Sequence, residues 1–192
     1  METADVTRMR LVGGNPALDF LNTRTGPDDD VLLGYPELVA WAVYAGVLTE
    51  TLEHDDPDGA QAVFTRALAT RDYLDEIFRP LAAGADPSPA ALTRLRDDEA
   101  DALAHASLER GSAFVWSWRE DRSLARPLRP VIHAAVGLLT AGALERIKGC
   151  GGCGFLFHDE SKNRSRRWCS MEDCGTDAKM RRYVVARRAR SA

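Results

Sequence analysis

Cys150-Gly-Gly-Cys153 and Cys169-Ser-Met-Glu-Asp-Cys174 contain all four cysteines of this 192-residue chain. The spacing C-x2-C-x15-C-x4-C is typical of two thiolate pairs that meet across a short hairpin and bind one Zn²⁺ tetrahedrally. A catalytic zinc usually keeps one position for water, and four cysteines leave none. We therefore predict that Cys150, Cys153, Cys169 and Cys174 hold one structural zinc ion.

The spacing alone leaves two other states of these cysteines open, two disulfides or four free thiols. His158 is an alternative ligand, although four cysteines already complete the shell. The N-terminus lacks the basic start and apolar stretch of a secretory signal, and no apolar run approaches the length that crosses a bilayer. We therefore expect a cytoplasmic protein without a membrane partner, in a reducing compartment that favours metal over disulfides.

The residues around the cysteines predict the local fold. The glycines of residues 150–154 favour a tight metal knuckle, and the sequence then predicts a strand at 155–158, a polar loop at 159–165 and a returning strand at 166–169. Ser170-Met-Glu-Asp173 has the form of a capping box, which starts a helix with Cys174 in its first turn. Knuckle, β-hairpin and helix together predict a small treble-clef-like zinc finger.

Residues 1–144 are predicted to form a mainly α domain with a short strand component, and residues 145–192 to form the finger. Phe114–Trp118, rich in aromatic and β-branched residues, is the best strand before the cysteines. Residues 23–30 are expected to be a polar loop. Helical patterns occur at residues 17–22, at 36–48, from Asp58 to just before Pro80, from Ser88 as far as Leu108, and at 131–147.

The last of these patterns is almost free of charge, which predicts a buried central helix. Only Lys148 and Gly149 separate its predicted end from Cys150. We therefore expect the finger to follow the end of this helix rather than to hang on a flexible tether. Such a short junction would couple the finger to the domain before it.

Charge is distributed unevenly along the chain, whose net charge is −4. Residues 145–192 hold 12 Lys or Arg and 6 Asp or Glu, whereas residues 1–144 hold 13 and 23. A small basic module on an acidic body suggests a polyanionic partner for the module alone. The other interpretation is a basic end that only improves solubility.

The finger residues resemble those of the CGNR zinc finger family. Besides the cysteines, the resemblance rests on Leu156-Phe157-x-Asp159-x-Ser161-Lys162, Ser165-Arg166-Arg167-Trp168-Cys169-Ser170-Met171, Cys174-Gly175 and Lys179. The upstream segment that resembles the opening of the ABATE domain, which accompanies such fingers, is Leu11-x-Gly13-Gly14-x2-Ala17-Leu18-Asp19-Phe20-x-Asn22-Thr23. The two resemblances imply a bacterial stress-related transcription regulator with a DNA-binding finger.

One position departs from the family pattern. The naming motif Cys-Gly-Asn-Arg appears here as Cys174-Gly175-Thr176-Asp177, so an acid replaces a base near the start of the helix. If the arginine meets phosphate in relatives, Asp177 would repel that phosphate. If the position serves the helix N-terminus instead, an acid is favourable there.

Seven basic residues of the finger are candidate nucleic-acid contacts, because the charged side chains of arginine and lysine bind phosphate. They lie on the predicted hairpin tip, the return strand and the terminal helix: Lys162, Arg164, Arg166, Arg167, Lys179, Arg181 and Arg182. We predict a transcription factor that binds DNA through these residues. The alternative is a zinc-stabilised protein-interaction module without direct DNA binding.

Asp19, Asn22 and Arg24 follow the glycine-rich turn and form a candidate pocket for a small-molecule effector, with the N-terminal domain as sensor by analogy with the family. A turn and helix start held by side-chain hydrogen bonds is the simpler interpretation. No histidine or acidic cluster has a catalytic pattern, so an enzyme is not expected. A palindromic DNA site would require a homodimer, and no heptad pattern predicts one.

Overall fold

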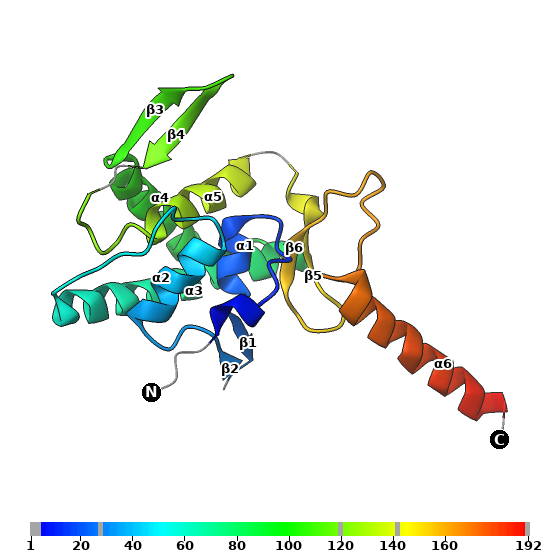
Figure 1. The fold of residues 1–192 in the computed structure, drawn as a ribbon. Helices are drawn as coiled ribbons and strands as arrows, with labels where there is room; N and C mark the ends of the chain where they lie inside the picture. The colour runs from blue at the N-terminus through cyan, green and yellow to red at the C-terminus, as the bar shows by residue number, and fades with distance from the viewer. Residues whose placement is uncertain (1–4, 27–28, 119–120, 141–142, 191–192) are drawn as a thin grey trace.

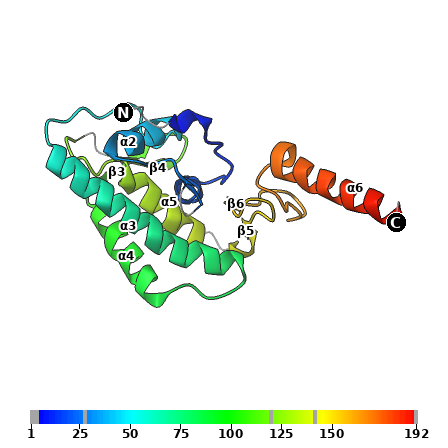
Figure 2. The same ribbon diagram turned by 90° about the horizontal axis from the view of Figure 1, so that it is seen from below.

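The computed structural model describes residues 5–26, 29–118, 121–140 and 143–190 (Figure 1). Helices form a body, and the last helix projects away from it with the C-terminus at its far end (Figures 1 and 2). The helices are α1 (Pro16–Leu21), α2 (Tyr35–Tyr44), α3 (Pro57–Ala82), α4 (Pro89–Leu103), α5 (Leu128–Thr140) and α6 (Thr176–Arg190). The antiparallel strand pairs are β1 (Arg24–Gly26) with β2 (Asp29–Asp30), β3 (Ala106–Arg110) with β4 (Phe114–Trp118), and β5 (Ile147–Gly149) with β6 (Leu156–His158).

This architecture confirms the predicted fold class, a mainly α region with short strands followed by a four-cysteine finger of hairpin and helix. The long helix α3 is the centre of the body. Asp56 caps its first turn by accepting a hydrogen bond from the Gly59 N–H (2.8 Å). The helix contacts α1, α2, α4 and β5, and its buried apolar residues include Phe64, Ala67, Leu74, Ile77 and Phe78.

The predicted end of α3 before Pro80 is wrong, since the helix continues through this proline to Ala82. A proline in the last turn removes only one late intrahelical hydrogen bond, so the helix tolerates it there. Because the Pro80 nitrogen carries no hydrogen, it cannot donate to the Glu76 carbonyl. This carbonyl accepts a hydrogen bond from the Ser88 N–H instead (3.4 Å). The start of the next helix therefore compensates the loss.

The segment before α3 also differs from the prediction. α2 ends at Tyr44 rather than at Leu48, because Gly46 adopts a left-handed conformation (φ 69°) that ends the helix. The expected polar loop at residues 23–30 contains the strands β1 and β2. Among the residues that the structure describes, no helix is both long and apolar enough to cross a membrane.

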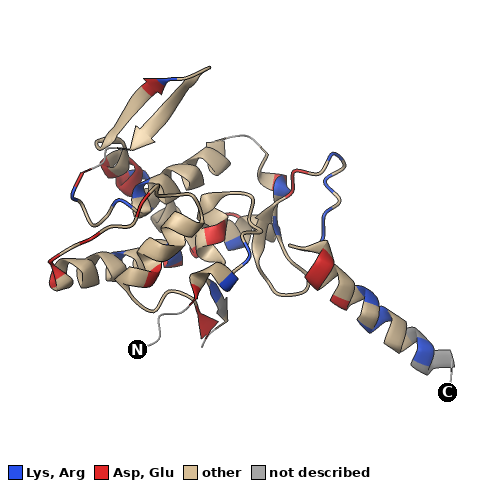
Figure 3. Cartoon of the chain, viewed as in Figure 1, with Lys and Arg blue, Asp and Glu red and all other residues tan. Residues whose placement is uncertain are grey.

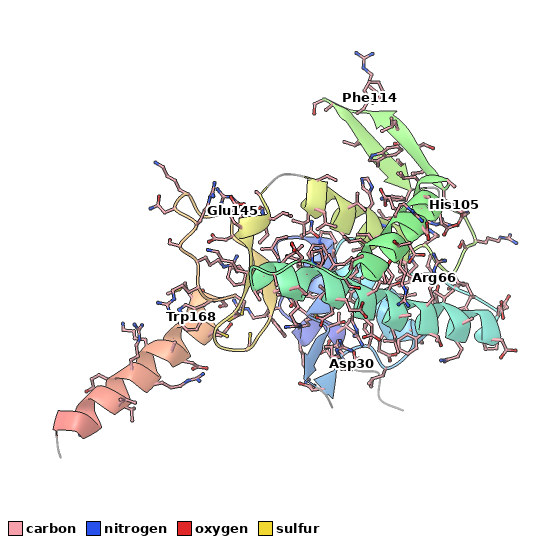
Figure 4. The ribbon with its side chains drawn as sticks, turned by 180° about the vertical axis from the view of Figure 1, so that it is seen from behind. Asp30, Arg66, His105, Phe114, Glu145 and Trp168 are labelled. Carbon is pink, nitrogen blue, oxygen red and sulfur yellow. The ribbon has the colours of Figure 1, made fainter. Side chains whose placement is uncertain are left out.

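The strand predicted at Phe114–Trp118 is confirmed as β4, and its partner β3 lies where the sequence predicts helix. The helix after Ser88 ends at Leu103, and Leu108, predicted to lie on that helix, lies in β3 opposite Trp116. Pairing with an aromatic strand overrides the weak local preferences of residues 106–110. The hairpin stands away from the body (Figure 1), and Phe114 lies at its far end (Figure 4).

The helix predicted over residues 131–147 is wrong in its last part. α5 ends at Thr140, Leu144–Arg146 forms a 3₁₀ turn, and Ile147 begins strand β5. Ile147 and Leu156 are buried in the main core, where β5 contacts α3 and β6 contacts α1. Burial of this strand pair against the body outweighs the helical pattern of the same residues.

The returning strand predicted at residues 166–169 is also wrong. The partner of β6 is β5, with Lys148 opposite Phe157, so the hairpin encloses the knuckle instead of following it. The Arg166 N–H donates a hydrogen bond to the Asp159 side chain (3.0 Å) and is not available to a strand. The finger is thus attached to the body by a shared strand pair and not by the end of a long helix.

Candidate metal centre and basic surface

The four cysteine Sγ atoms lie within 4.8 Å of one another. The Sγ of Cys169 is 3.5 Å from that of Cys153 and 3.7 Å from that of Cys174. Zn–S bonds of about 2.3 Å place the sulfurs of a tetrahedral site about 3.8 Å apart. Since all four cysteines are free of disulfides, the donors fit one structural Zn²⁺, as the spacing predicts.

The turn between β5 and β6 positions the first cysteine pair. The Cys150 N–H donates to the Phe155 carbonyl (2.7 Å), and the Gly154 N–H donates to the Cys150 carbonyl (3.0 Å). Gly154 closes this turn at φ 79°, a conformation that favours glycine. The Gly152 N–H lies 3.4 Å from the Cys150 Sγ and donates to it, which stabilises a thiolate.

The second pair is positioned by a helix start. Cys174 lies in a single π-helical turn, Met171–Gly175, which leads directly into α6. Ser170 Oγ accepts a hydrogen bond from the Asp173 N–H (3.3 Å), so the predicted capping residue is confirmed, although the first turn is π-helical. The two pairs can approach closely because Gly152 has no side chain. A Cβ at this position would lie only 2.9 Å from the Cys174 Cβ.

The close packing of the cysteine sulfurs and the nearby backbone N–H groups shift the pKa values of the thiols. Burial would raise the pKa of the Cys150 thiol, but hydrogen bonds from backbone N–H groups at Cys169, Cys153 and Gly152 lower it to about 6. Burial, together with the neighbouring sulfurs, raises the pKa of Cys174 to about 11 and that of Cys169 still further. The backbone therefore favours one thiolate, and the full set of four needs the charge of a bound Zn²⁺.

Asp159 organises the loop between the two cysteine pairs. Its buried carboxylate accepts hydrogen bonds from Lys148 Nζ (2.6 Å), the Ser161 N–H (2.9 Å) and the Arg166 N–H (3.0 Å). Burial would raise the pKa of this carboxyl, but the hydrogen bonds outweigh burial and hold it well below its usual range. The sequence places Asp159 in a polar loop and gives no sign of this role.

The finger is joined to the body by polar contacts as well as by the shared core. Asn22 Nδ2 donates to the Leu156 carbonyl and its Oδ1 accepts from the Leu156 N–H, both at 2.9 Å. The His158 N–H donates to the Gly13 carbonyl (2.7 Å). Further contacts join Arg10 to Asp173 and Glu172, Arg79 to the Gly154 carbonyl, and Arg166 to the Val12 carbonyl.

The three residues of the predicted ligand pocket do not gather at one place. Asp19 accepts a hydrogen bond from the Gly13 N–H (2.7 Å) inside the turn, as the simpler interpretation expects. Asn22 and Arg24 line a cavity of about 380 Å³ between the body and the knuckle, and Cys153 forms part of its wall. An effector site at this junction stays a prediction.

Asp19 gives the protein a testable pH dependence. Burial raises the pKa of its carboxyl to about 6, although backbone N–H groups of Gly13 and Val12 oppose the rise. The native state then binds this proton more tightly than the unfolded state does, so stability falls as pH rises through the interval between the two pKa values. Asp19→Asn keeps an acceptor for Gly13 but has no charge to bury.

We therefore expect the native protein to lose about 1 kcal/mol more of its unfolding free energy than Asp19→Asn between about pH 5 and pH 7.5. Urea denaturation at both pH values measures the difference. Parallel pH profiles of the two proteins would show that the Asp19 carboxyl does not titrate in this interval.

The seven basic candidates have different surroundings. Figure 3 shows Lys and Arg along the long finger loop and α6. The Arg166 guanidinium is occupied by backbone carbonyls and lies 4.5 Å from the Phe157 ring, and Arg164 forms an ion pair with Glu145. The exposed candidates without a carboxylate partner among the described residues are Lys162, Arg167, Lys179, Arg181 and Arg182.

Two family models match the chain. The ABATE model, described as "Putative stress-induced transcription regulator", matches residues 14–142, and the CGNR zinc finger model matches residues 146–190. Both resemblances found in the sequence are thus confirmed. No curated protein matches the chain.

Proposed function

Since the chain belongs to the ABATE family, described as "Putative stress-induced transcription regulator", and carries a CGNR zinc finger, we propose that it binds DNA through this finger. The observation that carries the proposal is the group of five exposed basic side chains on the finger that have no carboxylate partner among the described residues, set against an acidic body. Such a surface attracts the DNA backbone without reading its sequence. The proposal includes no catalytic step.

The position of Asp177 is compatible with this proposal. Its exposed side chain lies in the first turn of α6. The π-helical turn Met171–Gly175 runs directly into α6, so the free N–H groups of the helix start lie after the Ser170 cap and not at Asp177. One exposed acid at this position leaves the five exposed basic side chains in excess on the finger. The basic residues Arg181 and Arg182 follow about one turn later on the same helix.

We further propose that the N-terminal domain acts as the sensor. The Asn22–Leu156 hydrogen bonds and the shared core give the body a direct mechanical connection to the finger. A small-molecule effector in the cavity beside Arg24 and Cys153 would contact both parts at once. Its binding would then favour one placement of the finger over another.

The DNA proposal is tested by titrating a fluorescein-labelled duplex of mixed sequence with the intact, zinc-loaded protein over a series of salt concentrations. With about three to five phosphate contacts, the slope of log K against log salt is expected to be about −2.7 to −4.5. Binding absent even at low salt would exclude the proposal. A partner protein retained after nuclease treatment would then favour the protein-interaction module.

A further inference from the structure

A notch lies between the metal knuckle and the start of α6. Its walls include Gly151, Arg167, Trp168, Arg181 and Arg182, and its volume is about 380 Å³. Figure 4 shows Trp168 where the finger meets the last helix. None of the residues that line the notch is acidic.

Trp168 lies close against two glycines at the notch. A Cβ on Gly151 would lie 2.9 Å from Trp168 Cζ3, and one on Gly175 would lie 3.3 Å from Trp168 Cδ1. A side chain at either glycine would crowd the indole, so the two glycines allow Trp168 its place in the notch. The Arg167 guanidinium lies 5.8 Å from the centre of the same ring, which limits its freedom as well.

The positive charges of the notch have no carboxylate close by in the described part of the chain. Arg167, Arg181 and Arg182 are exposed, and none has a carboxylate partner among the described residues. Asp177 precedes Arg181 by four residues on α6, yet the two side chains form no ion pair. The remaining guanidinium donors therefore stay available to an anion from outside.

Resting on the proposed DNA binding, we propose that this notch is a phosphate pocket that seats one backbone phosphate of a DNA strand. Arg181 and Arg182 donate to the phosphate from α6, and Arg167 donates from the opposite wall. A phosphate fills only part of the volume, so the flanking sugars pack against the Trp168 ring. The pocket separates these three arginines from Arg164 and Arg166, whose groups already serve the fold.

The test compares two charge-matched double variants of the intact protein. Arg181→Gln with Arg182→Gln removes two charges from the pocket. Lys162→Gln with Lys179→Gln removes two exposed charges from the same finger outside it. All four positions are at the surface, so zinc content and melting temperature are expected to match the native protein in both variants.

In the duplex titration, the pocket variant is expected to weaken binding at least tenfold and to reduce the salt slope by about 1, which corresponds to one lost phosphate contact. The control variant is expected to weaken binding two- to threefold. Equal losses in the two variants would overturn the pocket while the DNA proposal stands. If the native protein does not bind the duplex at all, both the DNA proposal and the phosphate pocket are excluded. If the pocket residues bind an RNA hairpin in preference to the duplex, the choice of DNA as the ligand is overturned.

Discussion

Cys169→Ser is expected to release the zinc ion and to unfold the finger. Cys169 is buried, and its Sγ lies at tetrahedral-edge distances from the sulfurs of Cys153 and Cys174. Structural zinc contributes of order 10 kcal/mol to the folding of small fingers. The separate core of the finger is too small to replace this, because in the described part of the chain its fully buried side chains are those of Cys150, Phe157 and Cys169.

Elemental analysis and a thermal melt measure the two effects. The expected result is less than one zinc per chain and a lower melting temperature, together with loss of DNA binding. His158→Gln is the matched control, since His158 is the alternative ligand suggested by the sequence and lies outside the four-cysteine group. A Cys169→Ser protein that keeps one zinc and its melting temperature would contradict the structural role.

Asn22→Ala is expected to lower the free energy of unfolding by about 2–5 kcal/mol, because it leaves the buried N–H and C=O of Leu156 without partners. This is a large share of the roughly 5–15 kcal/mol that stabilises a typical domain. Urea denaturation measures the loss. The duplex titration should also show weaker binding, although Asn22 lies outside the basic surface, because the finger loses its attachment.

Two further variants make this result specific. Asn163→Ala changes an exposed asparagine of the finger loop and is expected to alter stability by no more than about 0.5 kcal/mol. Asn22→Asp keeps an acceptor for the Leu156 N–H, and when protonated it again has a donor for the Leu156 carbonyl. Its stability should therefore fall as pH rises, whereas an Asn22→Ala protein as stable as the native one would contradict the bridging role.

The zinc finger could be predicted from the sequence because its signal is local. The spacing of the cysteines and the capping box before Cys174 depend on residues that are near one another along the chain. Ile147 shows where local patterns fail. It continues an apolar helical pattern, but its burial against α3 as part of β5 decides its conformation.

The junction between body and finger could not be predicted for a related reason. The sequence suggests a pocket role for Asn22 because the residue follows a glycine-rich turn. Its partner, Leu156, is 134 positions away, and no pattern near Asn22 indicates that pairing. The same holds for Arg10, whose ion-pair partners in the finger lie 162 and 163 positions later.

The Asn22–Leu156 pairing also has a consequence for the order of events during synthesis. Asn22 leaves the ribosome long before Leu156 does, and at roughly 5–20 residues per second the separation of 134 positions takes roughly 7–27 s. During that time α1 lacks the strand pair that covers it in the native protein. The packing around α1 is therefore among the last parts of the protein to form, because it waits until the knuckle has emerged. A shortage of zinc in the cell would then also delay the maturation of the N-terminal domain.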